Sequence, residues 1–143
     1  EDIIHRLNTC GLLDSGGGLN PFTSGVVRSA MELGLMDENL TLLKETYSRR
    51  MQTMGAALRS RLPASARFID PAGGFFIWLS LPEGADTLDL LAKAKSRNVE
   101  FMPGSKFSSR QGLKNCLRLS FAYYDTPELL EGVERLAAVV GKG

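Results

Sequence analysis

The spacing of apolar residues changes at Pro63 from a helical to a strand pattern. In the first part of the chain, Ile3, Ile4, Leu7 and Cys10 predict a short helix that Gly11 would end. Asn20 followed by Pro21 is a helix start, because an asparagine side chain can accept from the free amides of the first turn and proline suits the first helical position. This second helix is expected to run to Leu33 and to stop at Gly34.

A much longer helix is predicted from near Asp37 to Pro63. One apolar stripe runs along it, comprising Leu40, Leu43, Tyr47, Met51, Met54, Leu58 and Leu62. At about 1.5 Å per residue such a helix is longer than 30 Å, the diameter of a small domain. We therefore interpret residues 37–63 as a linking helix between a leading segment, residues 1–36, and a small domain, residues 64–143.

After Pro63 the pattern predicts strands alternating with helices, as in an α/β or α+β domain. Strands are expected at residues 67–70, 74–81, 99–102 and 115–122, and helices from Asp86 or Thr87 to Arg97 and from Thr126 to Val140. The strand at 74–81 is apolar at nearly every position, which predicts burial on both faces and hence a central strand.

Residues 115–122 place one arginine inside an apolar strand. Alternation puts Leu117, Leu119 and Phe121 on one face, and Arg118 with Cys116, Ser120 and Ala122 on the other, a small-residue face with room beside the arginine. A planar guanidinium there suits a bidentate grip on a carboxylate or phosphate. The alternative is an arginine that is half solvated or paired with Asp70 or Glu100, and the residues alone favour that alternative.

Composition and charge restrict the classes of protein. The chain has 143 residues, 43% hydrophobic and 23% charged, as in an ordinary soluble globular domain. Its formal net charge of +1 argues against nucleic acid as a partner. Cys10 and Cys116 have no further ligands at metal spacing, so we expect reduced thiols and no metal site. Neither a signal peptide nor a membrane span is indicated, which predicts a cytoplasmic protein, and a start without Met suggests a piece of a longer one.

Other candidate chemistry is weak. The glycines at 16–18 allow a phosphate cradle or a plain flexible loop, but they match neither the P-loop nor the dinucleotide fingerprint. His5, the one histidine, lies in the short first helix beside Arg6 and is expected at the surface rather than as a general base. Motifs for hydrolytic or metal-dependent mechanisms are missing from the sequence.

Four motifs in order resemble the C-terminal part of fold-type I pyridoxal-phosphate aminotransferases. They are Gly17 to Phe22 leading into the long helix, Gly73 to Leu79 with Leu81-Pro82, Val99 to Phe101 with Pro103-Gly104 and Phe107, and Asn115 to Phe121. The closest branch contains 2-aminoadipate, valine-pyruvate and broad-specificity aromatic aminotransferases, and the aminotransferase-like domains of certain transcription regulators. The resemblance implies a small domain with a mostly antiparallel sheet flanked by helices.

The resemblance also implies roles for particular residues. Arg118 matches the arginine that holds the substrate α-carboxylate, and Gly74 and Phe75 match positions that line the same pocket. Gly18 and Asn20 match a loop near the subunit interface and active site of a homodimer. The substrates implied are an amino acid and a 2-oxo acid, with pyridoxal 5'-phosphate as cofactor.

One departure from the family pattern limits the expected activity. The Schiff-base lysine and the phosphate cup lie upstream of this segment in the family, and none of the lysines present has the matching context; they are Lys44, Lys93, Lys95, Lys106, Lys114 and Lys142. We therefore expect this segment alone to be inactive and to leave the cofactor unbound. Two alternatives remain: an aminotransferase-like effector domain of a transcription regulator, and a small stand-alone anion-binding α+β module.

Overall fold

The computed structural model describes residues 2–11 and 20–141, which fall into two compact units, Glu1–Leu43 and Lys44–Gly143. Helix α4, Leu35–Arg61, contributes residues to both units. The expected division at residues 36 and 63 stays a prediction, and the two units are described separately.

The first unit contains helices α1, Asp2–Asn8, and α3, Pro21–Glu32. The Asn20 side chain accepts a hydrogen bond from the Thr23 backbone N–H at 3.0 Å, and Pro21 occupies the first turn of α3. After the C-cap at Leu33 the chain turns at Gly34, whose φ of 75° is readily adopted only by glycine. The predicted start and end of this helix are confirmed, whereas α1 ends at Asn8 rather than near Cys10.

Helix α4 extends from Leu35 to Arg61 and ends just before Pro63, as predicted. Its C-terminal half carries the buried residues Met54 and Leu58, with exposed fractions of 5% and 0%. Leu40, by contrast, is 43% exposed within the first unit. The apolar stripe is therefore used as a core face only in the second unit.

The sheet of the second unit has three antiparallel strands in the order β1-β3-β2: β1, Phe76–Ser80, β2, Met102–Pro103, and β3, Cys116–Ser120. The prediction that β1 is the central strand is wrong, because β3 lies in the middle. Two of the predicted strands form few of the expected pairings. Residues 67–70 form only an isolated bridge from Arg67 to Ser80, and residues 99–102 contribute Met102 alone to β2.

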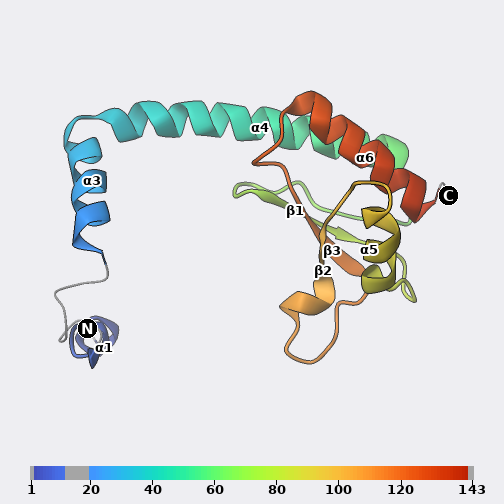
Figure 1. The fold of residues 1–143 in the computed structure, drawn as a ribbon, viewed down its shortest axis with the longest axis horizontal. Helices are drawn as coiled ribbons and strands as arrows, with labels where there is room; N and C mark the ends of the chain where they lie inside the picture. The colour runs from blue at the N-terminus through green and yellow to red at the C-terminus, as the bar shows by residue number, and fades with distance from the viewer. Residues whose placement is uncertain (1, 12–19, 142–143) are drawn as a thin grey trace. The chain divides into compact units, whose positions relative to one another are not determined.

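Three helices cover one face of this sheet: the C-terminal half of α4, α5, Thr87–Lys95, and α6, Thr126–Val140 (Figure 1). The core between them is one cluster with members from each helix and from β1 and β3, including Leu58, Ile77, Leu79, Ala94, Leu117, Leu119, Val133 and Leu136. The opposite face of the sheet has no helix in the cluster. This arrangement explains the continuous apolar run of β1, which is buried on one face and carries exposed aromatic side chains on the other.

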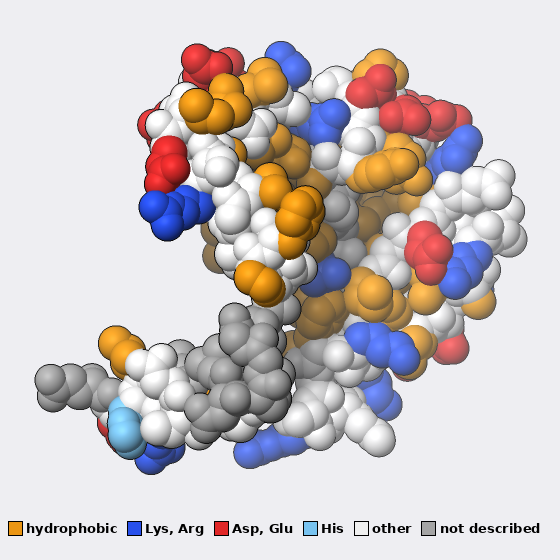
Figure 2. All heavy atoms as spheres, turned by 60° about the vertical axis from the view of Figure 1, so that its left-hand side comes forward, with side chains coloured by type: hydrophobic (Ala, Val, Ile, Leu, Met, Phe, Trp, Pro, Cys, Tyr) orange, Lys and Arg blue, Asp and Glu red, His pale blue; other side chains and the backbone are white. Residues whose placement is uncertain are grey.

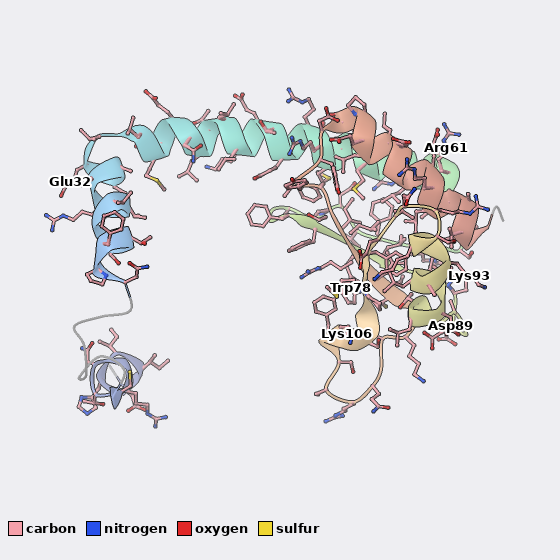
Figure 3. The ribbon with its side chains drawn as sticks, in the orientation of Figure 1. Glu32, Arg61, Trp78, Asp89, Lys93 and Lys106 are labelled. Atoms are coloured by element: carbon pink, nitrogen blue, oxygen red, sulfur yellow. The ribbon has the colours of Figure 1, made fainter. Side chains whose placement is uncertain are left out.

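Polar contacts define the ends of the helices. Asp86 caps α5 by accepting from the Leu88 N–H at 2.8 Å. Helix α6 begins at Thr126 as predicted, and its cap is Asp125, whose carboxylate forms a reciprocal capping box with the Glu128 side chain. On the surface, Arg61, labelled in Figure 3, forms a salt bridge of 2.9 Å with Glu134 of α6.

Among the residues described, we find no helix with the length and apolar character required to span a membrane.

Candidate functional site

Arg118 lies in the middle of the central strand β3, opposite Trp78 of β1 and Met102 of β2. Because directly opposed residues of antiparallel strands share a face, these three side chains project from the same side of the sheet. Leu117 and Leu119, with exposed fractions of 0% and 5%, face the core. The predicted division of β3 into an apolar face and an arginine face is confirmed.

Aromatic rings surround the Arg118 guanidinium. Its Cζ atom lies over the Phe76 ring, 3.8 Å from the centroid, and over the Phe107 ring, 4.8 Å from the centroid. Phe107 ends the short 3-10 helix η1, Gly104–Phe107, and its ring is 5.4 Å from that of Trp78. Trp78 of β1 and Lys106 of η1 are labelled in this region of Figure 3. The room expected beside Arg118 on the small-residue face of β3 is occupied in part by aromatic rings from outside β3.

The acids considered as partners of Arg118 are engaged elsewhere. Asp70 forms a salt bridge of 2.6 Å with Arg59, and Glu100 forms one of 2.9 Å with Lys95. Within the part of the chain that the structure describes, no salt bridge or hydrogen bond involves the Arg118 side chain. Its guanidinium N–H groups are therefore available to an external anion.

The face around Arg118 is open in this chain. The side chains of Phe76, Trp78, Met102 and Phe107 are each 36–44% exposed although all are large and apolar. Exposed hydrophobic side chains with separate Lys and Arg side chains among them are visible in Figure 2. Contiguous exposed apolar residues usually mark an interface or a ligand site. A half-buried arginine with an apolar rim is suited to a small carboxylate that carries an apolar group.

The predicted pocket residues Gly74 and Phe75 lie just before β1. Gly74 has a φ of 84°, which accounts for glycine at this turn. The Phe75 ring contacts Tyr47 edge-on at 5.3 Å and lies 6.3 Å from the Phe76 ring. Phe76, rather than Phe75, is therefore the direct neighbour of Arg118. Alternation places Phe76 on the same face of β1 as Trp78, but only the register of the folded sheet brings it beside Arg118.

The approach of η1 to β3 depends on one glycine. A Cβ atom at Gly104 would lie 2.3 Å from the Leu113 carbonyl oxygen and 2.7 Å from the Cβ and carbonyl oxygen of Cys116. Nearby, Thr87 is fully buried, and its hydroxyl lies 2.8 and 2.9 Å from the Lys114 and Cys116 carbonyl oxygens. These contacts hold residues 113–116 in place, and Arg118 follows two residues later in β3.

The remaining candidates lie in the first unit or outside the described residues. Gly18 and the other glycines at 16–17 lie outside the described residues. Asn20 caps α3, and the exposed His5 lies in α1, both within the first unit. The described residues contain no group of three or more His, Cys, Asp or Glu side chains that could hold a metal ion.

No family model matches the sequence. The chain is 34% identical over 121 residues to aromatic-amino-acid aminotransferase 1 of Thermococcus litoralis, a similarity that covers 85% of this chain and 29% of that protein. Among solved structures, it is similar to LysN, an alpha-aminoadipate aminotransferase of Thermus thermophilus, crystallised in complex with N-(5'-phosphopyridoxyl)-L-leucine. The two are 35% identical with a TM-score of 0.75, over 80% of this chain and 29% of LysN. It is also 24% identical over 140 residues, 98% of this chain, to the HTH-type transcriptional regulator YdfD of Bacillus subtilis.

A helix-backed antiparallel sheet that matches solved aminotransferases over 80% of the chain defines the small α/β domain of an aminotransferase. The chain belongs to the fold-type I pyridoxal-phosphate aminotransferases, in which it corresponds to a C-terminal segment. It spans about 29% of the length of the relatives that it matches first.

The described residues do not fit the covalent attachment of pyridoxal phosphate. Attachment requires a lysine amine inside a pocket next to a phosphate site. The lysines that the structure describes are all exposed, and Lys95 is paired with Glu100. What the described residues of the second unit offer instead is the Arg118 guanidinium on β3, which can bind an anion.

Proposed function

We propose that this chain is the small-domain part of a pyridoxal-phosphate-dependent aminotransferase, which transfers an amino group between an amino acid and a 2-oxo acid. The proposal is supported by the aminotransferases among its relatives, which are 34% and 35% identical to it. The whole protein would act as a cytoplasmic homodimer. In it, the cofactor supplies the electron-withdrawing chemistry of amino transfer, and this segment supplies binding and orientation of the substrate.

Arg118 is the residue that we propose to bind the substrate carboxylate. The single observation that carries this role is a half-buried guanidinium on an open face, whose conceivable acidic partners Asp70 and Glu100 are paired with other cations. A guanidinium offers two parallel N–H groups to a carboxylate, and this bidentate contact fixes the direction as well as the position of the substrate. Orientation of this kind raises the rate because the reacting atoms are held close together.

The test is the Arg118→Lys variant of the full-length protein that contains this chain. L-phenylalanine and L-2-aminoadipate serve as amino donors, with 2-oxoglutarate as acceptor. A hydrogen bond to a charged group contributes about 1.5–3 kcal/mol, so losing the fork should lower kcat/KM about 10- to 150-fold, mainly through KM. The matched control is Arg97→Lys, because Arg97 is exposed just after the C-cap of α5. A kcat/KM equal to that of the unmodified protein in Arg118→Lys would refute the proposed role.

A second candidate is the aminotransferase-like effector domain of a transcription regulator. It is favoured by the similarity to the YdfD regulator, which extends over 98% of this chain. A basic winged-helix segment upstream of residue 1, together with specific retention of a DNA fragment by the whole protein, would establish this candidate. An upstream large domain with a cofactor-binding lysine and no DNA-binding segment would decide for the enzyme.

A further inference from the structure

We propose that Phe76 and Phe107 are positioning residues that hold the Arg118 guanidinium in the orientation required to bind a carboxylate. This inference rests on the proposed role of Arg118. The two rings come from different elements, β1 and η1. The guanidinium carbon of Arg118 lies over both rings, 3.8 Å from the Phe76 centroid and 4.8 Å from the Phe107 centroid. Cation–π attraction acts at such distances, within about 6 Å of a ring centroid.

The backbone fixes the positions of both rings. Phe76 pairs with Ser120 in the β1–β3 ladder, two residues along from the Trp78–Arg118 pair, so its ring lies diagonally across from Arg118. Phe107 is held edge-on against Trp78, with the ring centroids 5.4 Å apart at an interplanar angle of 77°. The ring positions therefore follow from the register of the sheet and the placement of η1.

The arrangement has a specific consequence for carboxylate binding. A ring that covers a face of the guanidinium leaves the N–H groups at its edge available for the fork-shaped contact. An unrestrained arginine side chain loses much rotational freedom when it binds, and rings that hold it beforehand reduce this loss. The rings also displace water beside the cation, which strengthens its attraction for an anion.

Core packing is an alternative explanation for these two phenylalanines. Their exposed fractions of 39% and 44% argue against it, because residues whose main role is core packing in this unit are nearly inaccessible. A matched contact lies elsewhere in the same unit: Arg59 lies over the Phe68 ring at 4.7 Å, and its charge is satisfied by Asp70. That pair provides a control for an aromatic–arginine contact without a carboxylate-binding role.

The experiment measures kcat and KM for an amino-acid donor in the full-length protein. Phe76→Leu and Phe107→Leu are each expected to lower kcat/KM about 3- to 30-fold, mainly by raising KM, which corresponds to the loss of one partly desolvated cation–π contact. Phe107→Tyr, which keeps the ring, should restore kcat/KM to within about twofold of the original value. Phe68→Leu should leave kcat and KM unchanged.

A double-mutant cycle separates positioning from a structural role. In an Arg118→Met background the guanidinium is gone, and replacing either ring should change kcat/KM less than about twofold. A loss as large as in the Arg118 protein, or no rescue by Phe107→Tyr, would overturn the inference. Should Arg118→Lys lower kcat/KM while both leucine variants match the original protein, only the positioning role fails. Unchanged kinetics in Arg118→Lys would instead refute the proposed role of Arg118 on which the inference rests.

Discussion

Replacement of Gly104 by alanine tests whether the close approach of η1 to the β3 segment is as tight as the structure shows. The added Cβ would lie 2.3 Å from the Leu113 carbonyl oxygen, whereas ordinary contacts of this kind begin at 3.4 Å. Two more atoms, the Cβ and carbonyl oxygen of Cys116, would lie at 2.7 Å. Two of the three atoms are backbone oxygens, so no side-chain rotation relieves the overlap.

The magnitude follows from the required movement. Either η1 or the segment from Leu113 to Cys116 must move by about 1 Å, and that segment is held by the Thr87 hydroxyl, which shares its one hydrogen between two carbonyl oxygens of the segment. Inserting a methyl group into a well-packed site costs about 1–3 kcal/mol, occasionally more. With three contacts below 3.0 Å, we expect a loss at the upper end, about 3 kcal/mol in the free energy of unfolding.

The assay is equilibrium unfolding of the 143-residue chain in urea. For an m-value of about 2 kcal/mol/M, a loss of this size lowers the midpoint by about 1.5 M. Gly132→Ala is the matched control, because Gly132 lies inside α6 with nothing within 4 Å of an added Cβ, and alanine there should stabilise by about 0.5–1 kcal/mol. A loss below about 1 kcal/mol for Gly104→Ala would refute the close approach.

Two further predictions concern the core of the second unit. Leu58→Ala should lower the free energy of unfolding by about 2–5 kcal/mol, because Leu58 is fully buried. Its control is Leu42→Ala on the same helix, which should change the free energy of unfolding by less than about 0.5 kcal/mol because Leu42 is 62% exposed. Urea unfolding measures both variants, and equal effects would contradict the assigned core face. Thr87→Val should lower the free energy of unfolding by about 1–3 kcal/mol, because two backbone carbonyl groups lose the buried hydroxyl beside them. Thr87→Ser keeps a hydroxyl and should retain most of the stability. Thermal unfolding in which the serine variant is as unstable as the valine variant would show that the hydroxyl contributes little.

The local elements were predictable because their signals lie within a few residues. Asn20-Pro21 and Gly34 marked the ends of α3, and Pro63 marked the end of α4. Strand β3 and its two faces followed from alternation alone. Helix α6 begins at the predicted Thr126, but its cap, Asp125, depends on a reciprocal contact with Glu128.

Strand order was not predictable from the same signals. The apolar run at residues 74–81 is consistent with a strand buried on both faces and equally with one that has an exposed aromatic face, because both contain the same residue types. Which applies depends on where the helices pack, and all three pack on the face that carries Ile77 and Leu79. Of the segments expected as strands at 67–70 and 99–102, only Arg67 and Met102 pair with a neighbouring strand.

The sequence by itself determined the helices and several of their ends, the strand that carries Arg118, and the family through the order of its motifs. The tertiary structure alone decided what surrounds Arg118. Phe76 and Phe107 are 42 and 11 residues away along the chain and reach the guanidinium through strand register and the close approach of η1. Contacts between residues so far apart depend on pairing and packing, which no local pattern encodes.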